Sequence, residues 1–182
     1  MNTVGKQAWP VLFVSDQLNK DSDEGAWLGQ IIERLTKNET CSVLFCSTYA
    51  HAHDLVFSRE DLGTLVVDWE NADFERIHRK AEDMHENAPG KTQVSAAARL
   101  VEYARRRNKK LPILLLSDRS SVENLPNKTL EYVDGVIWKL TDTPAFNAGR
   151  IERAVAEYAR GALPSFFRTL VDYVNEHNFA WH

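Results

Sequence analysis

The chain has 182 residues, of which 43% are hydrophobic and 26% are charged, and its formal net charge is −4. This length fits one domain with a short appendage, and the acidic balance argues against a general nucleic-acid binder, which normally carries a basic excess. Because no apolar run approaches the ~18–20 residues of a membrane span and the N-terminus lacks a signal-peptide segment, we expect a cytoplasmic protein that neither enters a membrane nor binds nucleic acid.

Five short apolar runs bounded by turn residues predict five strands. They cover Pro10–Asp16, Val43–Ser47, Thr64–Asp68, Ile113–Asp118 and Val133–Lys139. Most of these runs are continuous rather than alternating, which is typical of strands buried on both faces of a parallel sheet. The two cysteines, Cys41 and Cys46, lie five positions apart at the second run, a spacing that favours neither a disulfide framework nor a zinc knuckle.

Helical patterns fill the gaps between the predicted strands. Apolar residues spaced by three or four positions form stripes over residues 27–35, 94–104 and 151–158. The stretch from Phe74 to Asn108 is too long for one crossover helix and is interrupted at Asn87–Gly90, so we expect two helices joined by a loop.

The alternation of strands and helices predicts an α/β fold. The expected architecture is a doubly wound, five-stranded parallel sheet of the flavodoxin or receiver type. Leu163 to Asn175 carries a wide apolar stripe that a minimal domain does not need, and it predicts an additional C-terminal linker helix. We therefore expect a domain at residues 1–161 and a linker at residues 162–182.

Polar residues stand at the ends of the predicted strands, where open parallel sheets bind their ligands. They are Asp16, Ser47, Asp68, Ser117 and Lys139. Four of them resemble the pattern of response-regulator receivers. In that pattern Asp68 would accept a phosphoryl group and Asp16 would help to hold Mg²⁺, while Ser117 and Lys139 would contact the phosphoryl oxygens.

Two features depart from the receiver pattern. Receivers usually carry a second acidic residue beside the one that matches Asp16, but the neighbours here are Ser15 and Gln17. The segment between Asp68 and Ser117 is also much longer than in a receiver. Two interpretations stay open: a working phosphoacceptor, and a vestigial pocket in a receiver-like fold without the chemistry.

Two further motifs predict no site. Asn87–Thr92 ends like a phosphate-binding P-loop, but position 85, where that motif needs glycine, is His85. His51, His53 and Asp54 partly match a metal-binding pattern that lacks its last histidine, and nothing brings His78 and His85 to them. We expect a surface histidine cluster, no metal site and no ATPase.

Arg105, Arg106 and Arg107 open the strongest basic run of the chain, which continues to Lys110. Cations at a helix C-terminus complement the helix dipole, which is the simpler interpretation. The alternative is a site for an anion or a nucleotide effector, or a surface for an acidic partner. No set of residues typical of nucleophilic catalysis is readable in the sequence.

The C-terminal stretch Asp142–His182 resembles the inducible ornithine/lysine/arginine decarboxylases of bacteria. In that family an Asp-Thr leads a helix ending in Tyr-x-x-x-x-Leu-Pro-Pro-Phe-Phe, and a second helix leads to Tyr-x-Trp-His-Thr-Pro-Gly-His. The residues that match are Tyr158, Leu163, Pro164, Phe166, Phe167, Leu170, Tyr173, Trp181 and His182. Ser165 replaces the second proline and Phe179 replaces the tyrosine, and the strand-helix layout from Pro10 onwards is similar too.

The resemblance implies the flavodoxin-like N-terminal wing domain of such an enzyme. The pyridoxal-phosphate domain would follow His182, so the chain is expected to lack the cofactor and to be inactive alone. The parent would convert a basic amino acid into an amine and CO₂, and many members serve acid resistance. The expected partners are the parent's own catalytic domain and other subunits of a homo-oligomer. A guanosine nucleotide binds near the wings of some members, and Arg99 or Arg105 would suit it chemically.

Overall fold

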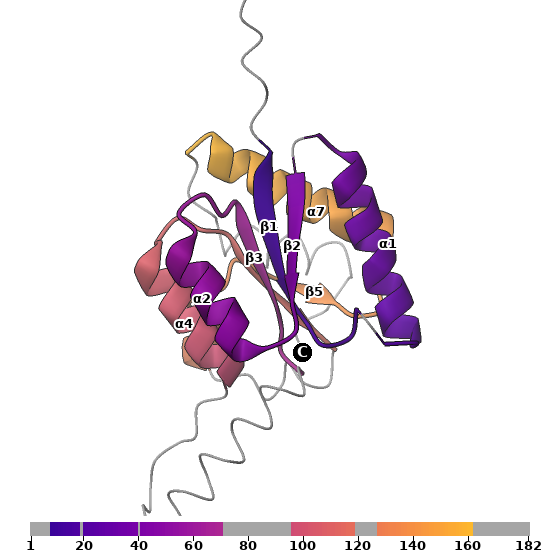
Figure 1. Ribbon diagram of the computed structural model, residues 1–182, viewed down its shortest axis with the longest axis horizontal. Coiled ribbons are helices and arrows are strands. Elements are labelled where there is room, and N and C mark those ends of the chain that lie inside the picture. Colours follow the sequence, from indigo (N-terminus) through magenta and orange to yellow (C-terminus); the bar gives the residue numbers. More distant parts are fainter. Residues whose placement is uncertain (1–7, 19, 40, 71–95, 119–126, 162–182) are drawn as a thin grey trace, which may run out of the picture.

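The computed structural model describes residues 8–18, 20–39, 41–70, 96–118 and 127–161 (Figure 1). Its elements are β1 (Trp9–Val14), α1 (Asp23–Lys37), β2 (Cys41–Cys46), α2 (Tyr49–Ser58), β3 (Thr64–Asp68), α4 (Ala96–Arg107), β4 (Ile113–Ser117), α6 (Asn127–Leu130), β5 (Gly135–Trp138) and α7 (Pro144–Ala159). Among these residues, no helix combines the length and the apolar character needed to cross a membrane.

The five strands form one parallel sheet in the order β2-β1-β3-β4-β5. This is the flavodoxin-like order of doubly wound folds, so the predicted fold class is confirmed. Helices α1 and α7 cover one face of the sheet, and α2 and α4 cover the other (Figure 1). All strands run in the same direction, which brings their carboxyl ends to one edge.

Two apolar cores sandwich the sheet because alternate residues of each strand point to opposite faces. In β1, Leu12 and Val14 join the core under α2 and α4, whereas Val11 and Phe13 join the core under α1 and α7. The central strands β1, β3 and β4 are almost wholly buried. Each fully buried aliphatic or aromatic side chain contributes about 1.5–3 kcal/mol to folding.

Side-chain caps fix where the helices begin. The hydroxyls of Ser22, Thr48 and Thr143 accept hydrogen bonds from backbone N–H groups in the first turns of α1, α2 and α7. Helix α2 carries no apolar stripe in the sequence because only Ala52 and Val56 are buried, which is why the pattern did not predict it.

Two of the sequence predictions fall outside the described residues. These are the first of the two helices between Phe74 and Asn108, with its loop at Asn87–Gly90, and the linker helix at residues 162–182. Within the described part, α7 ends at Ala159 and Gly161 adopts a φ of +73°, the left-handed conformation that commonly closes a helix.

Gly25 in α1 is expected to be intolerant of a side chain. A Cβ at this position would lie 2.7 Å from the Gln17 carbonyl oxygen and closer still to that of Lys20. We expect Gly25→Ala to lower the free energy of unfolding by about 1–3 kcal/mol, measured by urea denaturation. Gly29 is the matched control in the same helix, because a Cβ there meets nothing within 4 Å.

Gly29→Ala should instead raise the free energy of unfolding by about 0.5–1 kcal/mol, since alanine loses less backbone entropy in a helix. Equal effects of the two substitutions would contradict the close packing at Gly25.

Candidate functional site

A buried ion pair lies at the edge of the sheet where the strands end. Asp68 is the last residue of β3, and Lys139 follows β5 directly. The Lys139 Nζ lies 2.6 Å from Asp68 Oδ1, and the exposed fractions of the two side chains are 7% and 0%. The backbone turns sharply after Lys139, because Leu140 adopts a φ of 54°.

Two more carboxylates contact the same ammonium. Lys139 Nζ lies 2.7 Å from Glu24 Oε1 and 2.9 Å from Glu70 Oε2. Glu24 belongs to the first turn of α1, and Glu70 stands two positions after β3. One positive charge therefore faces three negative charges, and we call Lys139, Asp68, Glu24 and Glu70 the Lys139 cluster.

Two buried serines complete the hydrogen bonding of the Lys139 cluster. The Ser15 hydroxyl donates to Asp68 Oδ2 at 2.7 Å, and the Ser117 hydroxyl donates to Glu70 Oε1 at 2.6 Å. The Glu70 backbone N–H donates to Asp68 Oδ1 at 3.1 Å. Both oxygens of Asp68 are thus occupied by groups of the chain itself.

Burial and charge oppose each other in this cluster. Burial raises the pKa of Asp68 to about 6, although Lys139 and the Ser15 hydroxyl act to lower it. Burial by itself lowers the pKa of Lys139, but the carboxylates around it outweigh that effect and raise this pKa above its ordinary value. Lys139 therefore stays protonated at neutral pH, where Asp68 is mostly ionised.

The raised pKa of Asp68 makes the free energy of unfolding of the domain depend on pH. Between its ordinary pKa of 3.8 and about 6, the folded chain holds a proton that the unfolded chain has lost. The contribution of Asp68 to the free energy of unfolding should fall by up to about 3 kcal/mol as the pH rises through this window, and then level off.

A carboxyl ¹³C titration by NMR, with the signal assigned from Asp68→Asn, measures this pKa directly. Urea denaturation between pH 4 and 7 should show a shallower fall in Asp68→Asn than in the parent chain. Titration of Asp68 at or below its ordinary value would contradict this prediction.

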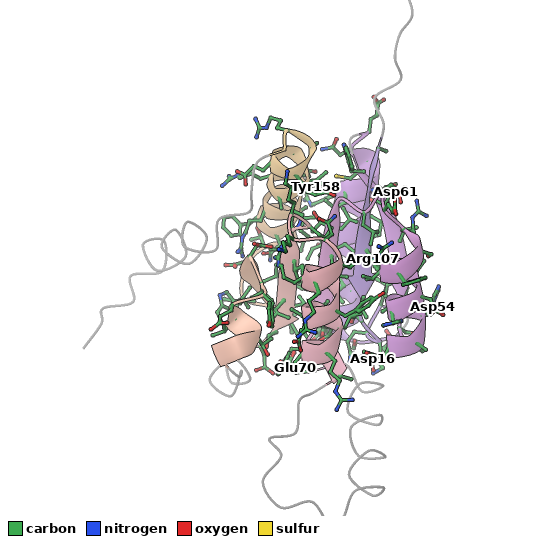
Figure 2. All side chains as sticks on the ribbon, turned by 90° about the vertical axis from the view of Figure 1, so that its left-hand side faces the viewer. Asp16, Asp54, Asp61, Glu70, Arg107 and Tyr158 are labelled. Carbon is green, nitrogen blue, oxygen red and sulfur yellow. The ribbon has the colours of Figure 1, made fainter. Side chains whose placement is uncertain are left out.

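Of the residues that match the receiver pattern, three meet and one does not. Asp68 and Lys139 are in contact, and Ser117 joins them through Glu70. Asp16 lies at the same end of the domain as Glu70 (Figure 2). Its carboxylate instead accepts hydrogen bonds from Lys20 at 2.5 Å and from the Gln17 side chain at 3.0 Å.

Ser15, Glu24 and Glu70 also belong to this site, although the sequence patterns did not predict them. Ser15 takes the place beside Asp68 that the pattern gave to Asp16. The position of Glu70 just after a strand end was a readable signal, but nothing in the sequence directs Glu24 from a helix towards Lys139. Asp68 is wholly buried and already paired, an arrangement that opposes its use as a nucleophile.

Arg105 is a structural residue in this fold. Its side chain extends from α4 to the residues just before β4 and β5, and it is 16% exposed. Its five N–H groups donate five hydrogen bonds of 2.5–3.0 Å, to the carbonyl oxygens of Tyr132 (twice), Lys109 and Leu111 and to Asp134 Oδ2. No donor of Arg105 remains for an anion.

The other arginines point elsewhere. Arg106 is 72% exposed and pairs with Glu102 one turn back in the helix. Arg107 lies over the Phe57 ring and donates to the Phe57 carbonyl oxygen at 3.1 Å. Arg99 is exposed on α4. The fold therefore does not gather these four arginines into one site.

The histidine pattern lies on α2. The His53 ring stacks on Tyr103 with centroids 4.3 Å apart, while His51 is exposed. Within the described ranges, no group of three or more histidine, cysteine or acidic residues is arranged to hold a metal ion. His78, His85 and the P-loop-like segment fall outside those ranges.

Comparison with known proteins relates the chain to amino-acid decarboxylases. It is 28% identical to the lysine decarboxylase LdcA of Pseudomonas aeruginosa over 96% of this chain, and 25% identical to the biodegradative arginine decarboxylase of Escherichia coli over 92%. The chain spans about a fifth of the length of these relatives, 21% and 20% respectively.

Solved structures share the fold. Lysine decarboxylase A from Pseudomonas aeruginosa superposes with a TM-score of 0.61 and 24% identity, over 97% of this chain and 22% of that one. A CheY-like receiver domain from Methanospirillum hungatei gives 0.57 and 16% identity, over 86% and 100%. At these identities both likenesses concern the fold alone.

A family model distinguishes the likeness to decarboxylases from the likeness to receiver domains. The model described as the Orn/Lys/Arg decarboxylase N-terminal domain matches residues 24–158, which include α1 from its second residue, each described helix and strand from β2 to β5, and nearly all of α7. The same range contains Glu24, Asp68, Glu70 and Lys139. The chain therefore belongs to the family of Orn/Lys/Arg decarboxylase N-terminal domains.

Proposed function

We propose that this chain is the non-catalytic assembly and regulatory domain of a pyridoxal-phosphate-dependent decarboxylase that acts on lysine, arginine or ornithine in the cytoplasm. The match of residues 24–158 to the family's N-terminal domain carries the proposal. The relatives named as lysine and arginine decarboxylases are about five times longer, which leaves room for a separate catalytic part. The partners would be that catalytic part and other subunits of a homo-oligomer.

The Lys139 cluster does not suit pyridoxal phosphate. Its attachment needs an uncharged lysine amine, and its phosphate needs a surplus of donors. Lys139 is held in its charged form by three carboxylates, and the excess negative charge of its surroundings would repel a phosphate. This charge balance supports our proposal that the cofactor binds to another part of the parent protein.

The purified 182-residue chain is expected to release no CO₂ from lysine, arginine or ornithine when pyridoxal phosphate is supplied. It should also leave the absorption spectrum of pyridoxal phosphate unchanged. The positive control is the parent protein under the same conditions. Turnover by the isolated chain would contradict a non-catalytic role.

The assembly role is tested in the parent. Deleting residues 1–161 should reduce the mass of the oligomer, measured by light scattering at several protein concentrations, while the remaining chain keeps its decarboxylase activity. An unchanged oligomer would remove the assembly role, and a loss of activity in an intact oligomer would point to a catalytic contribution instead.

A second candidate function is a receiver that is phosphorylated on Asp68. The contact of Asp68 with Lys139 at the strand ends favours it, and the complete burial of Asp68 opposes it. Incubation with Mg²⁺ and a small phosphodonor, followed by mass spectrometry, separates the two functions. A phosphoryl adduct that is absent from Asp68→Ala would support the receiver.

A further inference from the structure

Strand β2 forms one edge of the sheet. In the part of the chain that the structure describes, it pairs with β1 on one side and with no strand on the other. The strand, Cys41–Cys46, contains no charged residue and no proline, and its four middle residues are half-buried. Natural sheets usually protect their edges with charges, prolines or bulges, and an apolar edge without them is a template for another strand.

The backbone groups at this edge belong to Val43 and Phe45. The Cys46 carbonyl oxygen points towards β1, because it accepts a hydrogen bond from the N–H of Ser15, which follows β1. Successive residues of a strand direct their N–H and C=O groups to opposite sides, so Val43 and Phe45 direct theirs away from β1. Within the described residues, no group hydrogen-bonds to these outward N–H and C=O groups.

The other edge strand, β5, is protected. The Lys139 N–H donates to the Ser117 carbonyl oxygen on the β4 side, so the backbone groups of Val136 point outwards by the same alternation. Arg150 of α7 donates from Nη1 to the Val136 carbonyl oxygen at 2.9 Å. A long charged side chain at this place obstructs an incoming strand. Of the two edges, β2 is the one suited to pairing.

The edge of β2 is complementary to itself. A twofold axis perpendicular to the sheet at Leu44 would set β2 antiparallel to β2 of a second copy. Val43 would then lie opposite Phe45 of the second copy, and both belong to the face under α1 and α7. The two copies of Leu44 would meet on the face under α2 and α4. A shift by one residue would place opposite residues on different faces.

The backbone agrees with this register. In an antiparallel pair, opposite residues alternate between hydrogen-bonded and non-hydrogen-bonded pairs. Val43 and Phe45 direct their N–H and C=O groups outwards and would form the hydrogen-bonded pairs. Leu44, whose backbone groups face β1, would form the non-hydrogen-bonded pair, in which side chains lie closest. Backbone and side chains therefore favour the same register.

We propose that two copies of this chain pair antiparallel through the outer edges of β2, so that their five-stranded sheets become continuous. Val43 would contact Phe45 twice and Leu44 would contact its own copy, as aromatic, β-branched and aliphatic side chains do across strands. The strand pairing buries no charge of β2, because the strand carries none. The inference rests on the proposed assembly role and gives that role a surface and a partner.

Disulfide crosslinking tests the register. In the 182-residue chain, Leu44→Cys places two thiols in the non-hydrogen-bonded pair, where Cα atoms lie about 4.5 Å apart, within reach of a disulfide. Mild oxidation is expected to give a covalent dimer on a non-reducing gel. Val136→Cys on β5 is the matched control and should stay a single chain. The parent sequence should do so too, because Cys41 and Cys46 are buried.

Light scattering tests the contact without a crosslink. The mass of the unmodified chain should rise with concentration from that of one chain to that of two. Phe45→Lys places a charge at the edge and should raise the dissociation constant of the dimer at least about tenfold. Phe146→Lys, which replaces a 40% exposed phenylalanine on α7, is the matched control and should leave it unchanged. The dispersion of the NMR spectra shows that each variant is folded.

Three results would overturn the proposal. They are a mass of one chain at every concentration, equal crosslinking of Leu44→Cys and Val136→Cys, and equal effects of Phe45→Lys and Phe146→Lys on the dissociation constant. Deleting residues 1–161 of the parent tests the assembly role separately. If the deletion reduced the oligomer while Phe45→Lys in the parent left it intact, the β2 contact would be wrong and the assembly role would stand.

Discussion

Replacing Lys139 by methionine should lower the free energy of unfolding by about 3–5 kcal/mol at pH 7, the effect expected when one partner of a buried ion pair is removed. Methionine keeps much of the length of the side chain but leaves three carboxylates facing one another without a cation. The ionised form of Asp68 would be destabilised most, because this side chain is wholly buried. The loss should shrink towards pH 5, where Asp68, whose pKa burial raises to about 6, takes up a proton.

Two comparisons sharpen this prediction. Lys37→Met removes an ammonium that is 72% exposed and paired with Glu33, and it should cost less than about 1 kcal/mol. Adding Asp68→Asn to Lys139→Met removes the buried negative charge and should restore part of the lost stability. If Lys139→Met behaved like Lys37→Met in urea denaturation, the Lys139 cluster would not stabilise the fold.

Arg105→Lys should lower the free energy of unfolding by about 2–4 kcal/mol although it keeps the positive charge. Lysine has at most three donors in place of five and cannot reach several carbonyl groups at once. The carbonyl oxygens of Tyr132 and Leu111 would lose their partners. Asp134, which also accepts a hydrogen bond from the Ile113 N–H, would lose its cation.

The neighbouring residue provides the control. Arg106→Lys keeps an exposed charge opposite Glu102 and should change the stability by less than about 0.5 kcal/mol. Hydrogen exchange at the Ile113 amide adds a local measurement, since its acceptor Asp134 is positioned by Arg105. Equal effects of the two substitutions, or unaltered exchange at Ile113, would show that Arg105 does not hold β4 and β5 together.

The two ends of the domain differ in chemical character. At the end where receivers carry out phosphoryl transfer, Lys139 neutralises the carboxylates internally and Asp68 is sealed from solvent. Near the ends of α2 and α4, the side chains of Arg107 and Glu60 are 40% and 88% exposed. The charges at the carboxyl ends of the strands are therefore buried and internally paired, whereas those near the ends of α2 and α4 face solvent.

Much of the fold could be predicted from local patterns. The continuous apolar runs predicted five buried parallel strands, because a strand covered on both faces has no position for a polar side chain. Helix α2 was missed because a helix with two buried residues, Ala52 and Val56, leaves no apolar stripe to recognise. The arginine run shows a further limit of prediction from sequence. A helix turns by about 100° per residue, so the consecutive Arg105, Arg106 and Arg107 side chains face three different surroundings.

The sequence by itself determined the parallel sheet, the polar residues at its strand ends and the family pattern, since each of these is written in neighbouring residues. Only the tertiary structure decided that Lys139 meets Glu24 and Glu70 while Asp16 turns to Lys20. Glu24 and Lys139 are more than a hundred residues apart in the chain. Their contact depends on how α1 lies against the sheet, and apolar spacing fixes which face of a helix is buried but not its tilt or its depth.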